Sequence, residues 1–383
     1  MNPSVAKEIN DAVVLPATHT YKTLDAWRGL ASLWVVLFHA SAPLLDKEHL
    51  QNNPLYTLPL LGYLGVWMFF VISGYCISHA AAQSLSRPNG LRTYVVARFR
   101  RIYLPCWFSL IFYIALSALA FFLVSHNFLK SSTLAEKPTL HHGWLFYVSN
   151  LSLTQVLLHQ NYISDVCWTL CYEVGFYVLV GIAIAFASKI GNERTLLSGL
   201  HILTICSLLF FIIAPGKICY PFDYWPQFGL GILIYDLIKH HQKITMIAAG
   251  MTAILFVVFA WTHSSGVGYH GIGGRIPFLF GLAFAATLML IHRYDEQLSR
   301  IRFVQWLSRL GLFSYSLYLI HVLVVGVVLQ VLNKLHLEAA WIGVDLSVIV
   351  SVIAAYGFYL CFEKPFIKKN QKARVLVGAE PIQ

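Results

Sequence analysis

The feature that most limits what this chain can fold into is a series of apolar runs, each near 20 residues long, that recur along nearly its whole length. A helix of about 20 apolar residues crosses the hydrocarbon core of a bilayer. Of the 383 residues, 58% are hydrophobic and 11% are charged, whereas a soluble domain has about 25% charged residues. The sequence therefore predicts an all-α, polytopic membrane bundle and excludes soluble, disordered and fibrous proteins.

The runs predict about ten transmembrane helices. Their expected bounds are 27–45, 59–82, 103–124, 168–187, 196–214, 220–238, 244–262, 274–291, 310–332 and 340–362. The segment 143–159 is apolar but short and interrupted by polar residues, so we expect a re-entrant or interfacial segment rather than an eleventh span. The predicted domains are a polar N-terminal segment 1–23, a transmembrane domain 24–366 and a basic tail 367–383.

The positions of the cationic residues predict the orientation. If the N-terminus is cytoplasmic and the spans alternate, most of the 27 Lys and Arg residues fall in inner segments, as the positive-inside rule requires. Both termini are therefore expected in the cytoplasm, and the net charge of +10 reflects topology rather than nucleic-acid binding. Residues 40–42 resemble a signal-peptidase site, but the long polar segment before the first span favours an uncleaved helix.

Ionisable residues inside the predicted spans are candidates for function, because a charge at the bilayer centre costs about 2.5–3.5 kcal/mol on insertion scales. Asp25 and Arg28 lie at the inner end of the first span, and His39 lies toward its outer end. Eleven residues at about 100° each complete three turns to within about 20°, so Arg28 and His39 share one helix face about 16 Å apart. The alternative is an interfacial anchor and a packing histidine.

Glu173 lies near the start of the fourth span, which is expected to enter from the outer side. Its predicted depth, about 8–9 Å from the outer surface, matches that of His39. A carboxylate beside an imidazole fixes its tautomer and stabilises the imidazolium. We therefore expect Glu173 to be the partner of a general base, His39, with a structural ion pair to an arginine as the alternative.

Two further arginines, Arg98 and Arg101, precede the third predicted span on the same side as Arg28. Clustered guanidinium groups bind phosphates through paired hydrogen bonds, although ordinary positive-inside topology gives the same pattern. Ser73 lacks the surrounding glycines of a nucleophile elbow, so close helix packing is expected there. His321 lies mid-span and needs a polar partner.

No metal site is predicted. The adjacent histidines His141 and His142 have no further ligands at the spacing that metal sites use.

Six motifs occur in order over nearly the full length of the chain. They are LDAWRGLASLWVVLFH, GVWMFFVISGYCIS, the arginine pair Arg98 and Arg101, WTLCYEVGFY, FSYSLYLIH and FEKPF. Together they resemble the acyltransferase 3 family, whose members are integral membrane proteins that move acyl groups from cytoplasmic acyl-coenzyme A to an extracytoplasmic or lipid-linked acceptor. Trp67 stands where the family often has an acidic residue. In the stretch before Glu173, where the family often has serines or an asparagine, this chain has Thr169, Cys171 and Tyr172.

The resemblance implies that Arg28, Arg98 and Arg101 bind the phosphates of acyl-coenzyme A, while His39 and Glu173 are catalytic. Direct transfer and a covalent acyl-histidine both remain open. Further candidates named by these motifs are Asp25, Ser73, Trp168, Tyr172, Ser316 and His321.

The WTL-x-YE form is most similar to the exopolysaccharide branch of the family. It implies acetyl transfer to a glycan or lipid-linked saccharide at a bacterial cytoplasmic (inner) membrane.

Two other functions compete with this one. Buried charges also line the pathways of transporters, including flippases of polyprenyl-linked sugars, but no inverted repeat is visible in the sequence. A non-catalytic envelope scaffold is the second alternative. The retention of Arg28, His39 and Glu173 at compatible positions argues against it.

Overall fold

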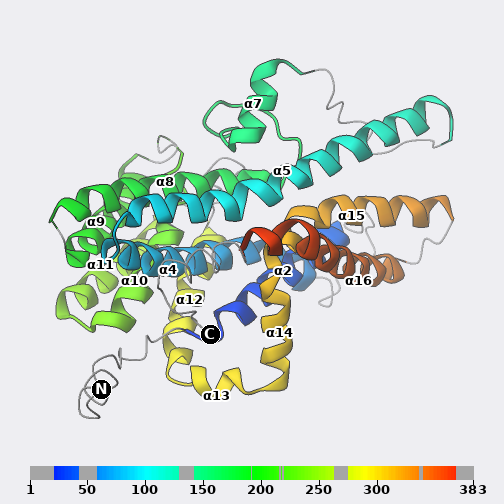
Figure 1. Cartoon of the computed structure of the whole chain (residues 1–383). Helices are drawn as coiled ribbons and strands as arrows, with labels where there is room; N and C mark the ends of the chain where they lie inside the picture. Colours follow the sequence, from blue (N-terminus) through cyan, green and yellow to red (C-terminus); the bar gives the residue numbers. More distant parts are fainter. Residues whose placement is uncertain are drawn as a thin grey trace, which may run out of the picture.

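The computed structural model describes residues 21–42, 58–128, 142–190, 192–214, 217, 220–262, 275–335 and 340–367. Throughout these ranges the regular structure is helical and no strand occurs, which confirms the predicted all-α fold. The helices pack into an elongated bundle with the short helices α13 and α14 at one side (Figure 1). In order they are α2 (Leu24–Ser41), η2 (Leu61–Leu64), α4 (Gly65–Leu85), α5 (Gly90–Ser125), α7 (Trp144–Ser152), α8 (Cys167–Ile190), α9 (Glu193–Ile213), α10 (Trp225–His240), α11 (Lys243–Thr262), α12 (Arg275–His292), α13 (Asp295–Ser299), α14 (Arg302–Leu312), α15 (Ser314–Lys334), α16 (Ala340–Phe358) and the π-helix η3 (Tyr359–Glu363).

Within the described ranges, 8 helices are long and apolar enough to cross a membrane. They correspond to eight of the predicted spans. The other two predicted spans contain α2 and α10, which are not in that set: α2 carries Asp25 and Arg28, and α10 has only 16 residues. Both helices are largely buried against other helices. Their side chains therefore contact protein rather than lipid and need not all be apolar. The total of ten spans stays a prediction.

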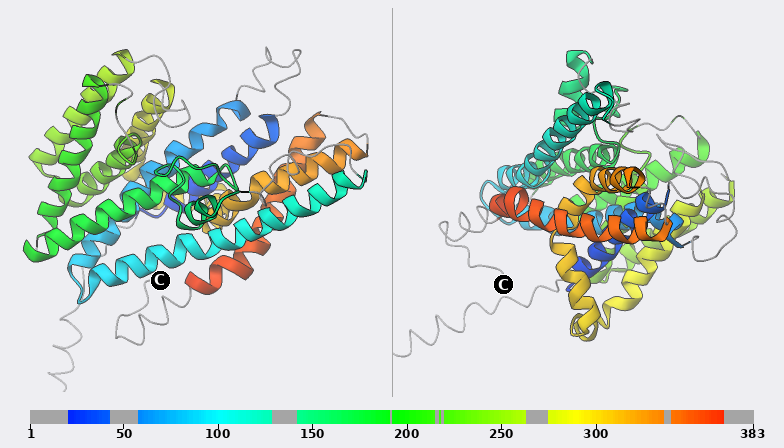
Figure 2. Two further views of the ribbon diagram at one scale, coloured as in Figure 1. Left: turned by 90° about the horizontal axis from the view of Figure 1, so that it is seen from above. Right: turned by 90° about the vertical axis from the view of Figure 1, so that its right-hand side faces the viewer.

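The third predicted span is part of a much longer helix. α5 runs for 36 residues, about 54 Å, along most of the length of the bundle (Figures 1 and 2). Arg98 and Arg101 therefore lie on the helix itself and not in a loop before it. As a result, their side chains are held at fixed angles around the helix axis.

The segment expected to be re-entrant or interfacial contains a short helix and an irregular stretch. α7 has 9 residues, too few to cross a bilayer. Residues 153–166 follow it without regular structure, yet Leu153 and Gln155 are fully buried. The Asn150 carboxamide satisfies this buried backbone, donating to the carbonyl of Asn161 and accepting from the amide of Ile163. α8 then begins directly at Cys167, which is also fully buried.

Two close helix contacts depend on glycine. A Cβ on Gly74 of α4 would overlap the carbonyl oxygen of Phe228 in α10, and a Cβ on Gly29 of α2 would overlap the carbonyl oxygen of Leu307 in α14. The close packing expected at Ser73-Gly74 is therefore confirmed for Gly74. These contacts join α4 to α10 and α2 to α14 almost backbone to backbone.

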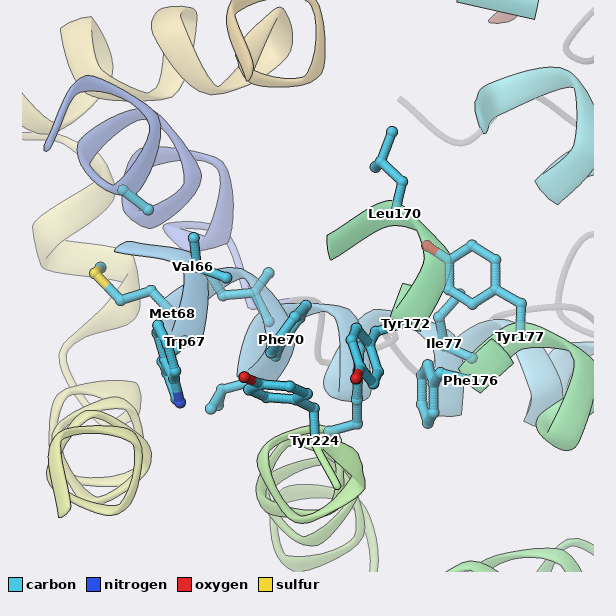
Figure 3. Close-up of a cluster of buried hydrophobic side chains, with 14 of the residues drawn as sticks. Val66, Trp67, Met68, Phe70, Ile77, Leu170, Tyr172, Phe176, Tyr177 and Tyr224 are labelled. Carbon is cyan, nitrogen blue, oxygen red and sulfur yellow. The ribbon is translucent and has the colours of Figure 1, made fainter. Parts of the chain in front are cut away.

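An aromatic cluster fills the interior between α4, α8 and the start of α10 (Figure 3). Trp67, which replaces the acidic residue of the related motif, is fully buried and packs edge-to-face on Tyr63 and Tyr224. Such edge-to-face pairs add about 0.5–1.5 kcal/mol beyond the area that they bury. At this position the chain therefore has a packing residue in place of a charge.

Candidate active site

A cavity of about 70 Å³ lies between α2, α4, α5, α8 and α15. One water molecule needs about 10–15 Å³ of such space, so the cavity can admit part of an extended chain. Its lining residues are Arg28, Val66, Phe69, Phe70, Ser73, Arg101, Ile102, Thr169, Leu170, Glu173, Ser314, Tyr315 and Tyr318.

Two arginines line this cavity. The guanidinium of Arg28 lies 3.4 Å from an oxygen of Asp25 and 3.6 Å from the sulfur of Cys76, and its side chain is only 18% exposed. Arg101 approaches from α5 and forms no ion pair with any described acidic residue. Two guanidinium groups therefore face one cavity with spare hydrogen-bonding capacity, which is the arrangement that binds phosphates.

The predicted arginine cluster is divided. Arg28 and Arg101 share the cavity, but Arg98 does not line it. The guanidinium of Arg98 instead lies over the ring of Tyr177, 5.8 Å from its centre. Because α5 continues through both arginines, residues three apart differ by about 300° around its axis, so they reach different neighbours.

Glu173 lies at the arginine end of the cavity. Its carboxylate accepts hydrogen bonds from the hydroxyl of Ser73, at 3.1 Å, and from that of Tyr177. The structure corrects the predicted pairing, since Glu173 forms no hydrogen bond with His39. The predicted depth takes α8 to start at the outer surface, whereas Leu153, Gln155 and Val166 in the segment that leads into it are buried.

His39 has another histidine as its partner. Its Nδ1 lies 3.2 Å from Nε2 of His321 and 2.9 Å from the carbonyl oxygen of Val35. The two imidazole rings are nearly perpendicular, with centres 4.8 Å apart. His321 is fully buried, so the polar partner that its mid-span position requires is His39.

The backbone around these rings fixes their tautomers. Nδ1 of His321 lies 2.8 Å from the carbonyl oxygen of Tyr318 and 3.1 Å from that of Leu317. A carbonyl only accepts, so this Nδ1 carries the proton and Nε2 of neutral His321 is an acceptor. Nδ1 of His39 then donates to His321 and Val35. Nε2 of His39 then keeps its lone pair and forms no hydrogen bond with any described residue, as a general base requires.

Phe69 and Tyr318 separate the cavity from the histidines. Their rings meet edge-to-face with centres 5.9 Å apart, and both line the cavity. The hydroxyl of Tyr318 lies 2.6 Å from that of Thr169, and its ring centre is 5.8 Å from that of His321. Sequence reasoning missed Phe69 and Tyr318, because a periodic pattern treats them as ordinary packing residues.

Three other candidates lie away from the cavity. The hydroxyl of Tyr172 donates to Asp223 at 2.6 Å, and Trp168 packs on Tyr172 within the aromatic cluster. The hydroxyl of buried Ser316 donates to Glu363. These contacts hold helices together. No group of three or more metal-ligating side chains occurs within the described part of the chain, which includes His142 but not His141.

Comparison with protein families identifies the chain. The acyltransferase domain of the acyltransferase 3 family matches residues 21–361. This chain belongs to that family. It is therefore a membrane O-acyltransferase, which confirms the predicted family and enzyme class. No curated protein and no solved structure matches the chain.

Proposed function

We propose that this acyltransferase moves an acyl group, acetyl by default, from acyl-coenzyme A to a hydroxyl of an extracytoplasmic or lipid-linked polysaccharide. One observation carries the proposal: the cavity lined by Arg28 and Arg101 is also lined by Tyr318, one helical turn from His321, which contacts His39. A route with phosphate-binding groups at one end and a base at the other suits a long anionic thioester.

The donor fits the dimensions of this route. Arg28 and His39 lie about 16 Å apart along α2, a span that the extended pantetheine arm of coenzyme A covers. The phosphates would be bound by Arg28 and Arg101 through charge-assisted hydrogen bonds. Glu173, held by Ser73 and Tyr177, would orient these guanidiniums. The cavity would admit the arm, and the side chains of Phe69 and Tyr318 would move aside for the thioester.

The chemistry follows from the free nitrogen of His39. Nε2 of His39 takes the proton of the acceptor hydroxyl, and the hydroxyl oxygen attacks the carbonyl carbon of the thioester. The carbon–sulfur bond then breaks, and the proton on His39 passes to the leaving thiolate. His321 acts as a positioning residue, because its Nε2 holds Nδ1–H of His39 and thereby aims Nε2 of His39 at the acceptor.

The polysaccharide acceptor and the bacterial cytoplasmic membrane are proposed from the motif around Glu173, WTLCYEVGFY, and its resemblance to the exopolysaccharide branch. A saccharide hydroxyl suits the partly exposed His39. Because the phosphates of the donor would occupy the end with Arg28 and Arg101, the acceptor would approach His39 from the opposite end.

The test uses membrane vesicles that contain the wild type or His39→Ala, supplied with acetyl-coenzyme A and cell-envelope glycan. We expect free thiol release that requires both His39 and the glycan. Glycan translocation without thiol release would replace the proposal with a transporter. Radiolabelled acetyl transferred to the protein in the absence of glycan would replace direct transfer with an acyl-histidine route.

A further inference from the structure

A second and larger cavity, of about 300 Å³, lies between α9, α10 and α11, away from the cavity that contains Arg28. Its walls are one face of α9 and one face of α11. The lining residues are Arg194, Leu197, Ser198, His201, Ile202, Ile205, Asp236, His240, Gln242, Ile244, Thr245, Ile247, Ala248 and Met251. The α9 residues recur at three- and four-residue spacings from Arg194, so they form a single stripe along that helix.

The cavity is polar at one end and apolar along the rest. Arg194 and His201 lie seven residues apart on α9, two turns or about 10 Å. Beyond them the walls are aliphatic, and Ile202 and Ile247 are 62% and 57% exposed. Because α9 and α11 are both candidate membrane spans, these exposed aliphatic side chains face lipid. The cavity is therefore open to the acyl chains of the bilayer.

The acidic groups near the polar end already have partners. Asp236 accepts hydrogen bonds from His201, His240 and Thr245, at 2.8, 2.8 and 3.0 Å. Glu193 accepts two hydrogen bonds from the ammonium of Lys239, at 2.7 and 2.8 Å. Within the described ranges, Arg194 has no acidic partner. Its positive charge at the cavity edge is thus left uncompensated.

His201 supplies a second unsatisfied group. It is only 8% exposed, and its Nδ1 is buried with no hydrogen-bond partner among the described residues. Its Nε2 faces the Asp236 carboxylate, which only accepts, so Nε2 carries the proton and Nδ1 of the neutral ring is an acceptor. An unpaired acceptor at a buried position is unfavourable unless a ligand hydroxyl donates to it.

We propose that this cavity binds an anionic phospholipid whose head group carries hydroxyls. Arg194 binds the phosphodiester, a head-group hydroxyl donates to Nδ1 of His201, and one acyl chain lies between the aliphatic faces of α9 and α11. Basic pockets between membrane helices recognise anionic lipids in this way. The site is separate from the cavity that leads to His39, so it adds a structural or regulatory lipid to the enzyme.

The test measures thermal unfolding of the purified full chain in neutral detergent, titrated with phosphatidylglycerol or with phosphatidylcholine of the same acyl chains. We expect a saturable rise in the unfolding midpoint with phosphatidylglycerol and a much smaller rise with phosphatidylcholine. Equal responses to the two lipids would overturn the proposal. Inorganic phosphate that gives the same rise would instead indicate a site for a free anion.

Two matched pairs of variants test the two ends of the site. Arg194→Gln should weaken the apparent affinity for phosphatidylglycerol about tenfold, the effect of one charge-assisted hydrogen bond, whereas Arg302→Gln, at the exposed start of α14, should not change it. Ala248→Phe, which fills the apolar part, should abolish saturable binding, and Ile254→Phe, 64% exposed on the same helix, should leave it intact. Unchanged binding in both Arg194→Gln and Ala248→Phe would exclude this location.

Discussion

Nδ1 of His39 lies 3.2 Å from Nε2 of His321, although 282 positions separate the two residues in the sequence. The contact joins α2 to α15 inside the bundle. His321 is bound on its other side by backbone carbonyls, so it can only accept from His39. This pair of contacts determines which nitrogen of His39 carries the proton and which keeps its lone pair.

The first prediction concerns His39. Removing a general base lowers turnover by about 10²–10⁴-fold, so His39→Ala should lose kcat by an amount in this range while the protein remains folded. The measurement is thiol release under saturating acyl-coenzyme A and glycan, with folding checked by thermal unfolding. His126→Ala, at the exposed end of α5, is the control and should keep full activity. Wild-type kcat in His39→Ala would exclude the proposed base.

The second prediction separates positioning from binding at His321. His321→Ala should lower kcat about tenfold, the worth of one hydrogen bond to the base, and leave KM for acyl-coenzyme A unchanged. His321→Gln should recover part of the loss, because its amide oxygen can accept from Nδ1 of His39. A raised KM with normal kcat would assign His321 to substrate binding instead.

The third prediction concerns the arginines. Arg28→Ala and Arg101→Ala should each raise KM for acyl-coenzyme A about 10- to 100-fold, since a hydrogen bond to a charged group contributes about 1.5–3 kcal/mol. Arg98→Ala should have a smaller effect, because Arg98 packs on Tyr177 outside the cavity.

An acyl-pantetheine donor, which lacks the coenzyme phosphates, provides the control for these arginine variants. Its KM should be the same in the wild type, Arg28→Ala and Arg101→Ala. A rise in KM for acyl-pantetheine as large as that for acyl-coenzyme A would show that the arginines support the fold of the cavity rather than bind phosphate.

The fourth prediction concerns stability. Gly29→Ala should destabilise the protein by about 1–3 kcal/mol or more, because the added methyl overlaps the backbone of α14. Gly199→Ala adds the same methyl to α9 where no atom lies within 4 Å. This control should be neutral or stabilising by up to about 1 kcal/mol. Equal unfolding midpoints for the two variants would contradict the close contact between α2 and α14.

The sequence predicts the helical fold well because a helix that crosses a membrane needs a run of about 20 apolar residues, and such runs are visible in the sequence. Arg28 and His39 were assigned to one helix from spacing alone, and α2 contains both. Helix periodicity, however, says nothing about which helices meet. It therefore predicted that His321 needs a partner without identifying His39.

The error at Glu173 has a different cause. Its expected depth rests on the assumption that the apolar run begins at the membrane surface. The partly buried, irregular segment before α8 has no periodic signal, and the amide of Gln155 in this segment donates to Asn150 of α7. Hydropathy cannot distinguish such a segment from a surface loop.

The glycine contact beside Arg28 has a mechanical consequence. Gly29 and Gly311 bring the backbones of α2 and α14 so close that neither helix can slide past the other without a clash. Arg28 and His39 therefore lie on a helix that packs almost backbone to backbone on α14. A protein that alternates its opening between two sides of a membrane needs helices that rock, whereas in the proposed mechanism the acyl chain would move along α2 while this contact stays in place.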